Sequence, residues 1–335
     1  MKKNKALRAA GALMIAVLLT TCLTAGTFAK YTTSGSAQDS ARVAKFGVTV
    51  SANGSLYGSA YDGTAHKPAD YTAGADTLTV KAGTDASDNV VAPGTKNESG
   101  LGFALNGKPE TDVQITGYVE AKNIFLASGE YGVMTKVTTN TITSQNFGMG
   151  TYYIRSNGVY SQAAAFDANV SDYYVLKDTA SVTDIYYPVV YSLNGTAGTT
   201  AAQPDSAAAI AKTVADKLQN GTASADSGNR TGVVKYTFNK LYKNNTDLSA
   251  EVDLASEKLT WEWVFTAAGA DAKDTILGDL QAQDKNDSTF KNYGEVVKKS
   301  TDAITNAVTY KAPQAGTDYS LETGFDISVT VEQAD

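Results

Sequence analysis

The stretch "DVQITGYVEA", residues 112–121, alternates apolar and polar side chains. Val113, Ile115, Val119 and Ala121 fall on one face of an extended chain, because successive side chains of a strand point to opposite sides. This alternation predicts a strand with one face on an apolar core and the other face in water.

Similar alternation recurs along the chain, at residues 44–50, 258–265 and 324–333. Pro188 lacks the N–H that a central strand needs, so the strand around it is predicted to lie at the edge of a sheet. Asn157 and Gly158 tolerate positive φ and predict a tight hairpin turn. Six further stretches are predicted as strands: residues 77–82, 101–107, 151–156, 172–178, 185–193 and 232–241.

Two stretches follow helical spacing instead. Residues 205–219 place their large apolar side chains on one helical face, with Asp205 as the capping residue. Residues 271–283 predict a weaker helix, since Gly278 lowers the propensity by about 1 kcal/mol relative to alanine. Many strands and two helical insertions predict a mainly β fold, a β-sandwich with helices in its long connections. Because no repeat or linker divides the chain, residues 41–335 are expected to form one domain.

The first 29 residues predict a secretory signal. A basic start is followed by the apolar run Ala9–Leu23 and by small residues up to Ala29. A permanent membrane anchor needs about 20 apolar residues, and the threonines in this region leave too few. Cleavage is predicted between Ala29 and Lys30, which would make Lys30 the first residue of a secreted protein.

The net charge of the chain excludes two classes of partner. Removing the four basic residues of the signal changes the formal net charge from −7 to −11. Nucleic acids and anionic membranes bind basic surfaces, so neither is expected as a partner.

Cys22 is the single cysteine and lies within the signal. The alternative is a lipoprotein acylated at Cys22, although Thr21 stands where such signals carry a smaller residue.

Candidate catalytic and binding residues are few. His66 is the only histidine, so an H-E-x-x-H zinc motif cannot form, and the polar sequence around it favours an exposed loop residue. No serine lies in a G-x-S-x-G nucleophile turn. Trp261 and Trp263 share one face of a predicted strand and could stack on sugars, but core packing is the preferred interpretation. We therefore expect no catalytic residues and no cofactor.

One stretch partly matches a calcium loop. Asp284, Asn286, Ser288 and Glu295 occupy its first, third, fifth and twelfth places, where oxygen ligands belong. Thr289 occupies the sixth place, where glycine permits the sharp turn. A polar connection is the preferred interpretation, with calcium binding as the alternative.

A family resemblance rests on the N-terminal region and on three later motifs. The apolar signal, Gly26–Ala29, Tyr31 and the strand "AKFGVTV" resemble the start of the TasA and camelysin family of Gram-positive bacteria. Later stretches resemble segments of the same family: "APGTKNESGLGFALNGKPETDVQI", "WEWVF" followed by "DAKDTILGDL", and "FDISVTVEQAD". The resemblance implies processing by a SipW-type signal peptidase and a jelly-roll form of the sandwich.

The resemblance also implies a role for residues 30–40. In fibre-forming members the mature N-terminal segment leaves its own domain and completes the sheet of the next subunit. Here that donor strand would comprise Lys30, Tyr31, Thr32, Thr33 and Ser34. An extended peptide added to a sheet edge gains backbone hydrogen bonds, so the mechanism is physically sound.

Three functional hypotheses follow. The first is a secreted structural subunit of extracellular matrix or surface filaments, which would bind copies of itself head to tail and could bind other matrix proteins. The second is a camelysin-like surface metalloprotease, disfavoured by the single histidine. The third is a monomeric surface binding module or adhesin.

Overall fold

The structure is a computed structural model. It describes residues 32–36, 41–43, 48–54, 56, 91–137, 141–198, 204–254, 257–264, 270–285 and 294–334. Several features expected from the sequence lie outside these residues: the signal with Cys22 and the cleavage site Ala29–Lys30, Tyr31, His66, the strand predicted over 77–82, and Asn286 and Ser288 of the calcium candidate.

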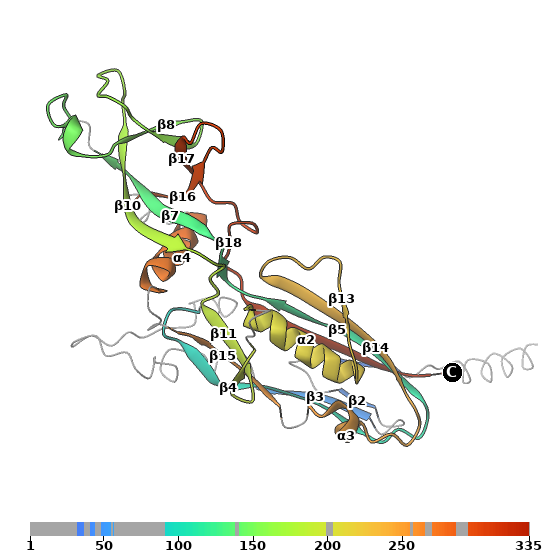
Figure 1. Ribbon diagram of the computed structural model, residues 1–335. Coiled ribbons are helices and arrows are strands. Elements are labelled where there is room, and N and C mark those ends of the chain that lie inside the picture. Colours follow the sequence, from blue (N-terminus) through green and yellow to red (C-terminus); the bar gives the residue numbers. More distant parts are fainter. Residues whose placement is uncertain are drawn as a thin grey trace, which may run out of the picture.

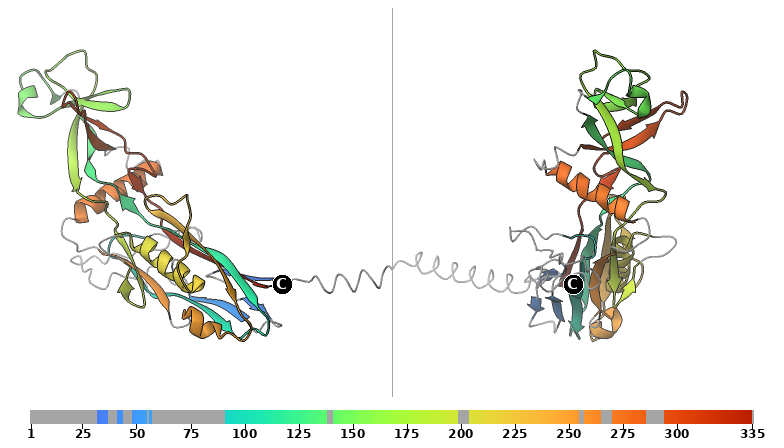
Figure 2. Two further views of the ribbon diagram at one scale, coloured as in Figure 1. Left: turned by 45° about the vertical axis from the view of Figure 1, so that its right-hand side comes forward. Right: turned by 90° about the vertical axis from the view of Figure 1, so that its left-hand side faces the viewer.

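The described residues form an elongated molecule with two lobes (Figures 1 and 2). The larger lobe is a sandwich of two antiparallel sheets, and the smaller lobe is a closed barrel. The C-terminus lies at the end of the sandwich that is remote from the barrel (Figure 1). The mainly β fold with helical insertions is therefore confirmed.

The first sheet is built around the strand predicted over residues 112–121. β5 (Val113–Lys122) pairs over ten residues with β19 (Gly324–Gln333) on one side and with β14 (Val233–Tyr242) on the other. The short β13 (Ser224–Ala225) and β1 (Thr32–Ser36) form the two edges. The strands predicted at 112–121, 232–241 and 324–333 are confirmed.

The second sheet faces the first and contains six strands. In order they are β12 (Thr196–Ala197), β11 (Val189–Leu193), β15 (Lys258–Trp263), β4 (Lys96–Gly107), β3 (Val48–Gly54) and β2 (Ala41–Val43). Pro188 immediately precedes β11, and on the side away from β15 this strand meets only the two-residue β12. The edge position predicted from Pro188 is thus confirmed apart from that short pairing.

The apolar faces of both sheets meet in one core. The side chains of Trp261 and Trp263 are buried, at 2% and 5% exposed, which confirms their assignment to the core. The indole N–H of Trp261 donates to the Leu56 carbonyl at 2.9 Å, so its polar atom is satisfied inside the sandwich. Buried side chains from both sheets complete this core, including Ile115 and Val329 of the first sheet and Leu105 of the second.

Helix α2 (Ser206–Gln219) packs against β5 and β14 of the first sheet and against β11 of the second. Asp205 caps its first turn by accepting from the N–H groups of Ala207 and Ala208. Asn220 ends the helix in the left-handed conformation at φ 43°. The helix predicted over 205–219 is confirmed. The shorter α3 (Leu248–Val252) lies near the opposite end of the sandwich from the barrel (Figure 1).

The barrel is a feature that the single-sandwich prediction did not include. Its strands are β10 (Tyr173–Val182), β7 (Gly129–Val137), β16 (Glu295–Thr301), β17 (Val308–Lys311), β9 (Val159–Gln162) and β8 (Tyr153–Ser156). A small core of its own, with Met134, Tyr160 and Val297 among its buried residues, fills it. The turn predicted at Asn157 and Gly158 joins β8 to β9, with both residues at positive φ.

The two lobes are connected by several short crossings of the chain. β6 (Phe125–Leu126) pairs with β18 (Tyr319–Ser320) at the junction, and the 3-10 helix η3 (Phe147–Met149) lies in the barrel lobe. Helix α4 (Ala270–Asp284) lies between the lobes (Figure 1) and packs against β10 and β16. The helix predicted over 271–283 is confirmed.

Candidate functional site

The N-terminal strand is the first candidate. β1 pairs antiparallel with β19, from Thr32 opposite Glu332 to Ser36 opposite Ser328. Of the predicted donor residues, Thr32, Thr33 and Ser34 therefore lie in a strand. The resemblance implies that this segment leaves its own domain, whereas in the single chain it adds to the sheet of its own domain. An attached strand is present at a high effective concentration, which favours this intramolecular pairing when no neighbour competes.

The start of β1 lies at one tip of the molecule. Thr32 lies opposite Glu332, near the C-terminus, and so at the end of the sandwich remote from the barrel. The next strand, β2, begins at Ala41 in the other sheet and pairs with β3. β1 is thus the outermost strand of the first sheet, and strand pairing joins it to β19 alone among the described strands.

β1 covers only the second half of β19. Residues Gly324–Ile327, the first four of β19, pair with β5, and no described strand pairs with their other edge. A Cβ placed on Gly324 would meet no atom within 4 Å, so the face of the sheet is uncrowded at this residue. An unpaired strand edge of this kind can accept an added strand.

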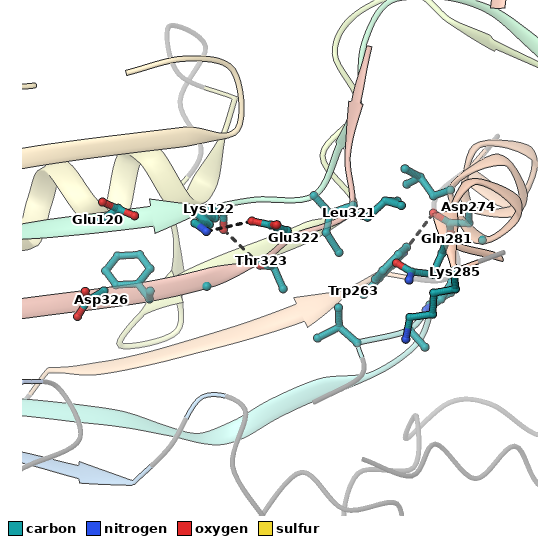
Figure 3. Close-up of a pocket in the computed structure, with 18 residues that line it drawn as sticks. Glu120, Lys122, Trp263, Asp274, Gln281, Lys285, Leu321, Glu322, Thr323 and Asp326 are labelled. Atoms are coloured by element: carbon teal, nitrogen blue, oxygen red, sulfur yellow. Dashed lines mark hydrogen bonds and ion pairs between the residues drawn. The ribbon is translucent and has the colours of Figure 1, made fainter. Parts of the chain in front are cut away.

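A cavity of about 770 Å³ adjoins this free edge (Figure 3). Its walls come from the start of β19, the end of β5, the residues before β4, Trp263 of β15, and helix α4. The volume lies within the range of ligand sites in proteins. Its apolar wall includes Ile124, Trp263, Leu277 and Leu321.

Helix α4 presents one face to the cavity. Asp274, Gly278, Gln281 and Lys285 line it at spacings of four, three and four residues, which follow the helical repeat. A Cβ on Gly278 would meet no atom outside its own helix within 4 Å. The glycine that weakens the predicted helix therefore keeps this wall of the cavity open.

Asp274 is the most unusual polar group of the cavity. Its side chain is 7% exposed, and its Oδ1 accepts from the Tyr186 hydroxyl at 2.8 Å and from the Trp263 indole N–H at 3.1 Å. Its Oδ2 is buried and has no hydrogen-bond partner among the described residues. Burial raises the pKa of Asp274 above its ordinary value, although these two hydrogen bonds act in the opposite direction.

The opposite wall carries further charges. Lys122 at the end of β5 forms an ion pair with Glu322 at 2.9 Å, and Asp326 accepts from the Tyr118 hydroxyl at 2.9 Å. The lining contains four carboxylates and two lysines: Glu120, Asp274, Glu322 and Asp326, with Lys122 and Lys285. The cavity is therefore acidic, with an excess of two negative charges when all six groups are ionised.

The calcium candidate is described only at Asp284 and Glu295, and each carboxylate interacts with a different part of the protein. Asp284 accepts from the Tyr319 hydroxyl at 2.9 Å. Glu295 accepts from the Tyr160 hydroxyl at 2.6 Å and forms an ion pair with Arg155 at 3.0 Å. Within the described ranges, no group of three or more histidine, cysteine, aspartate or glutamate side chains could hold a metal ion. The polar connection stays the preferred interpretation of this stretch, with calcium binding as the alternative.

The sequence did not single out the cavity. An aspartate within a helix that follows a strand is usually solvated, so nothing local marks Asp274 as buried. Its partners Tyr186 and Trp263 come from other parts of the chain and only the fold brings them together. Gly278 within a predicted helix was the one available signal, because glycine there costs about 1 kcal/mol relative to alanine.

Comparison with known proteins gives no match to any family model, curated protein or solved structure. No helix in the described part of the chain is long and apolar enough to cross a membrane. The resemblance to the TasA and camelysin family thus rests on the sequence motifs quoted above.

Proposed function

We propose that the protein is a secreted structural subunit of extracellular matrix or cell-surface filaments, which polymerises head to tail through its N-terminal strand. The observation that carries the proposal is the position of β1 as the outermost strand of the first sheet, paired with Ser328–Glu332 of β19. The jelly-roll form of the sandwich is part of the proposal and is supported by its two facing antiparallel sheets.

Strand exchange would convert this pairing into a filament. Ladder hydrogen bonds involve only the backbone, so β1 of a neighbouring copy can make the same bonds to β19 that the chain's own β1 makes. The donor strand and the accepting edge are different surfaces, so each subunit keeps one of each free and the contact propagates in one direction. β1 begins at one tip of an elongated molecule, which suits an end-to-end arrangement.

Signal cleavage would control the exchange. While Lys30 is joined to the signal, the tail is held at the membrane and cannot enter the sheet of a neighbour. Cleavage after Ala29 by a SipW-type signal peptidase would release it. Assembly would therefore begin only after secretion.

The test compares the chain Lys30–Asp335 with the shorter chain Ala41–Asp335, by size-exclusion chromatography and negative-stain microscopy. The proposal expects filaments from the longer chain and a folded monomer from the shorter one. A matched control of full length is Thr33→Pro, which disrupts the geometry of β1 without shortening the tail. Filaments from both chains, or monomers from both under all salt and pH conditions, would refute polymerisation through this strand.

A monomeric surface binding module is the second candidate. The observation that favours it is the cavity beside Gly324–Ile327, which does not take part in the pairing with β1. A chain that stays monomeric with its tail intact and binds a ligand in this cavity would give this candidate the lead.

A further inference from the structure

We infer that the cavity between α4 and β19 is a peptide-binding site, which takes a lysine or arginine side chain from an extended segment of a partner protein. The segment would add as a strand to the free edge Gly324–Ile327. This site is separate from the pairing of β1, which begins at Ser328.

The buried carboxylate of Asp274 points to a cation. Buried polar atoms in proteins almost always have a hydrogen-bond partner, and Oδ2 of Asp274 has none among the described residues. An ammonium or guanidinium group would supply a charge-assisted hydrogen bond to that oxygen. The acidic excess of the lining, with Glu120 and Asp326 beside the ion pair of Lys122 and Glu322, favours the same sign of ligand charge.

The apolar wall fits the rest of such a side chain. The apolar part of the cavity wall includes Trp263, Leu277 and Leu321. Lysine and arginine carry their charge on an apolar stem, which packs against surfaces of this kind while the head group reaches a polar partner. A small inorganic cation would leave this apolar surface uncovered.

The free edge of β19 distinguishes a peptide from a free amine. The unpaired edge and the lining of the cavity share three residues: Gly324, Phe325 and Asp326. A strand added there would gain backbone hydrogen bonds, and its alternate side chains would point to one face of the sheet. One molecule can thus satisfy the sheet edge and place a basic side chain in the cavity.

The test uses isothermal titration calorimetry on the chain Lys30–Asp335, with the probe peptide acetyl-Thr-Val-Lys-Val-Thr-amide, whose lysine is its only charge. A peptide with norleucine in place of lysine keeps the stem and removes the charge. A peptide methylated on alternate backbone nitrogens keeps the lysine and removes ladder donors. Free 1,5-diaminopentane supplies the ammonium without a backbone.

Three variants locate the binding. Asp274→Asn keeps an acceptor for Tyr186 and Trp263 and removes the charge, and it is expected to weaken the lysine peptide roughly 10-fold or more. Gly278→Leu fills the open wall and is expected to weaken it similarly. Asp279→Asn is the matched control, since this residue lies on the same helix and does not line the cavity. Thermal unfolding of each variant checks that it is folded.

The inference is supported if the lysine peptide binds, the norleucine and methylated peptides bind at least 10-fold more weakly, and only the two cavity variants lose affinity. Equal binding of the norleucine peptide, an unchanged affinity in Asp274→Asn, or no binding at millimolar probe would overturn it. If diaminopentane binds and the lysine peptide does not, strand addition is refuted. The cavity is then assigned to free amines. These outcomes do not depend on filament formation, because Gly324–Ile327 lie outside the register of β1.

Discussion

Asp205 is expected to stabilise the start of α2 and the packing of this helix on the sandwich. Its side chain is 7% exposed and accepts from the N–H groups of Ala207 at 3.0 Å and Ala208 at 3.4 Å. It also accepts from Nδ2 of the fully buried Asn123 at 2.9 Å. One carboxylate therefore satisfies the start of a helix and a side chain that follows β5.

Asp205→Ala removes both functions. Loss of a helix cap costs about 1 kcal/mol. Asn123 keeps its hydrogen bond to the Val189 carbonyl at 3.2 Å but loses its bond to Asp205, and a buried donor left partly unsatisfied costs roughly another 1–2 kcal/mol. We therefore expect the free energy of unfolding to fall by about 2–3 kcal/mol.

Asp205→Asn separates the hydrogen bonds from the charge. Asparagine caps helices as well as aspartate does and keeps one acceptor oxygen. Burial raises the pKa of Asp205, which means that the ionised form is disfavoured in the folded protein and that its charge contributes little net stability. The asparagine variant is expected to stay within about 1 kcal/mol of the unsubstituted protein.

Urea unfolding at neutral pH, followed by circular dichroism, measures both variants, with equal slopes required for the comparison. A loss below about 1 kcal/mol in the alanine variant would refute the importance of this cap. An equal loss in both variants would show that the charge, rather than the hydrogen bonds, stabilises this part of the fold.

Three further substitutions test the packing. Burial and the neighbouring Asp178 raise the pKa of Asp279 to about 6, so its ionised form opposes folding and the free energy of unfolding falls as the pH rises from about 4 to above 6. Asp279→Asn should therefore raise the free energy of unfolding by about 1 kcal/mol at neutral pH, after allowance for partial exposure, and leave it unchanged below about pH 4. Urea unfolding at both pH values measures this difference. Gly278→Ala should stabilise α4 by about 1 kcal/mol, because the added Cβ meets open space; an unchanged midpoint would contradict this. Gly117→Ala should lower the free energy of unfolding by roughly 1–3 kcal/mol, because its Cβ would overlap the Ser328 carbonyl and lie 2.6 Å from the Phe238 ring. An undiminished melting temperature in this variant would show that the sheet can relax.

The sequence by itself determined the local elements. Alternation identified β5, β15 and β19, and the spacing of apolar residues identified α2 together with its cap. These features follow from repeats of two and 3.6 residues, which any short stretch carries in its own side chains. The same alternation assigns Trp261 and Trp263 to the core, where both are buried.

Only the tertiary structure decided how these elements are shared between two lobes. The sequence of residues 290–308 is ambiguous and predicts part helix and part loop, whereas in the fold these residues include the strand β16, which pairs with β7 from more than a hundred residues earlier in the chain. The burial of Asp274 likewise depends on Tyr186 and Trp263, which reach it from other strands and loops. The free half of β19 exists because β1 is five residues long and β19 is ten. Pairing partners, closure of a barrel and the desolvation of a charge are set by contacts between distant residues, and no local periodicity encodes such contacts.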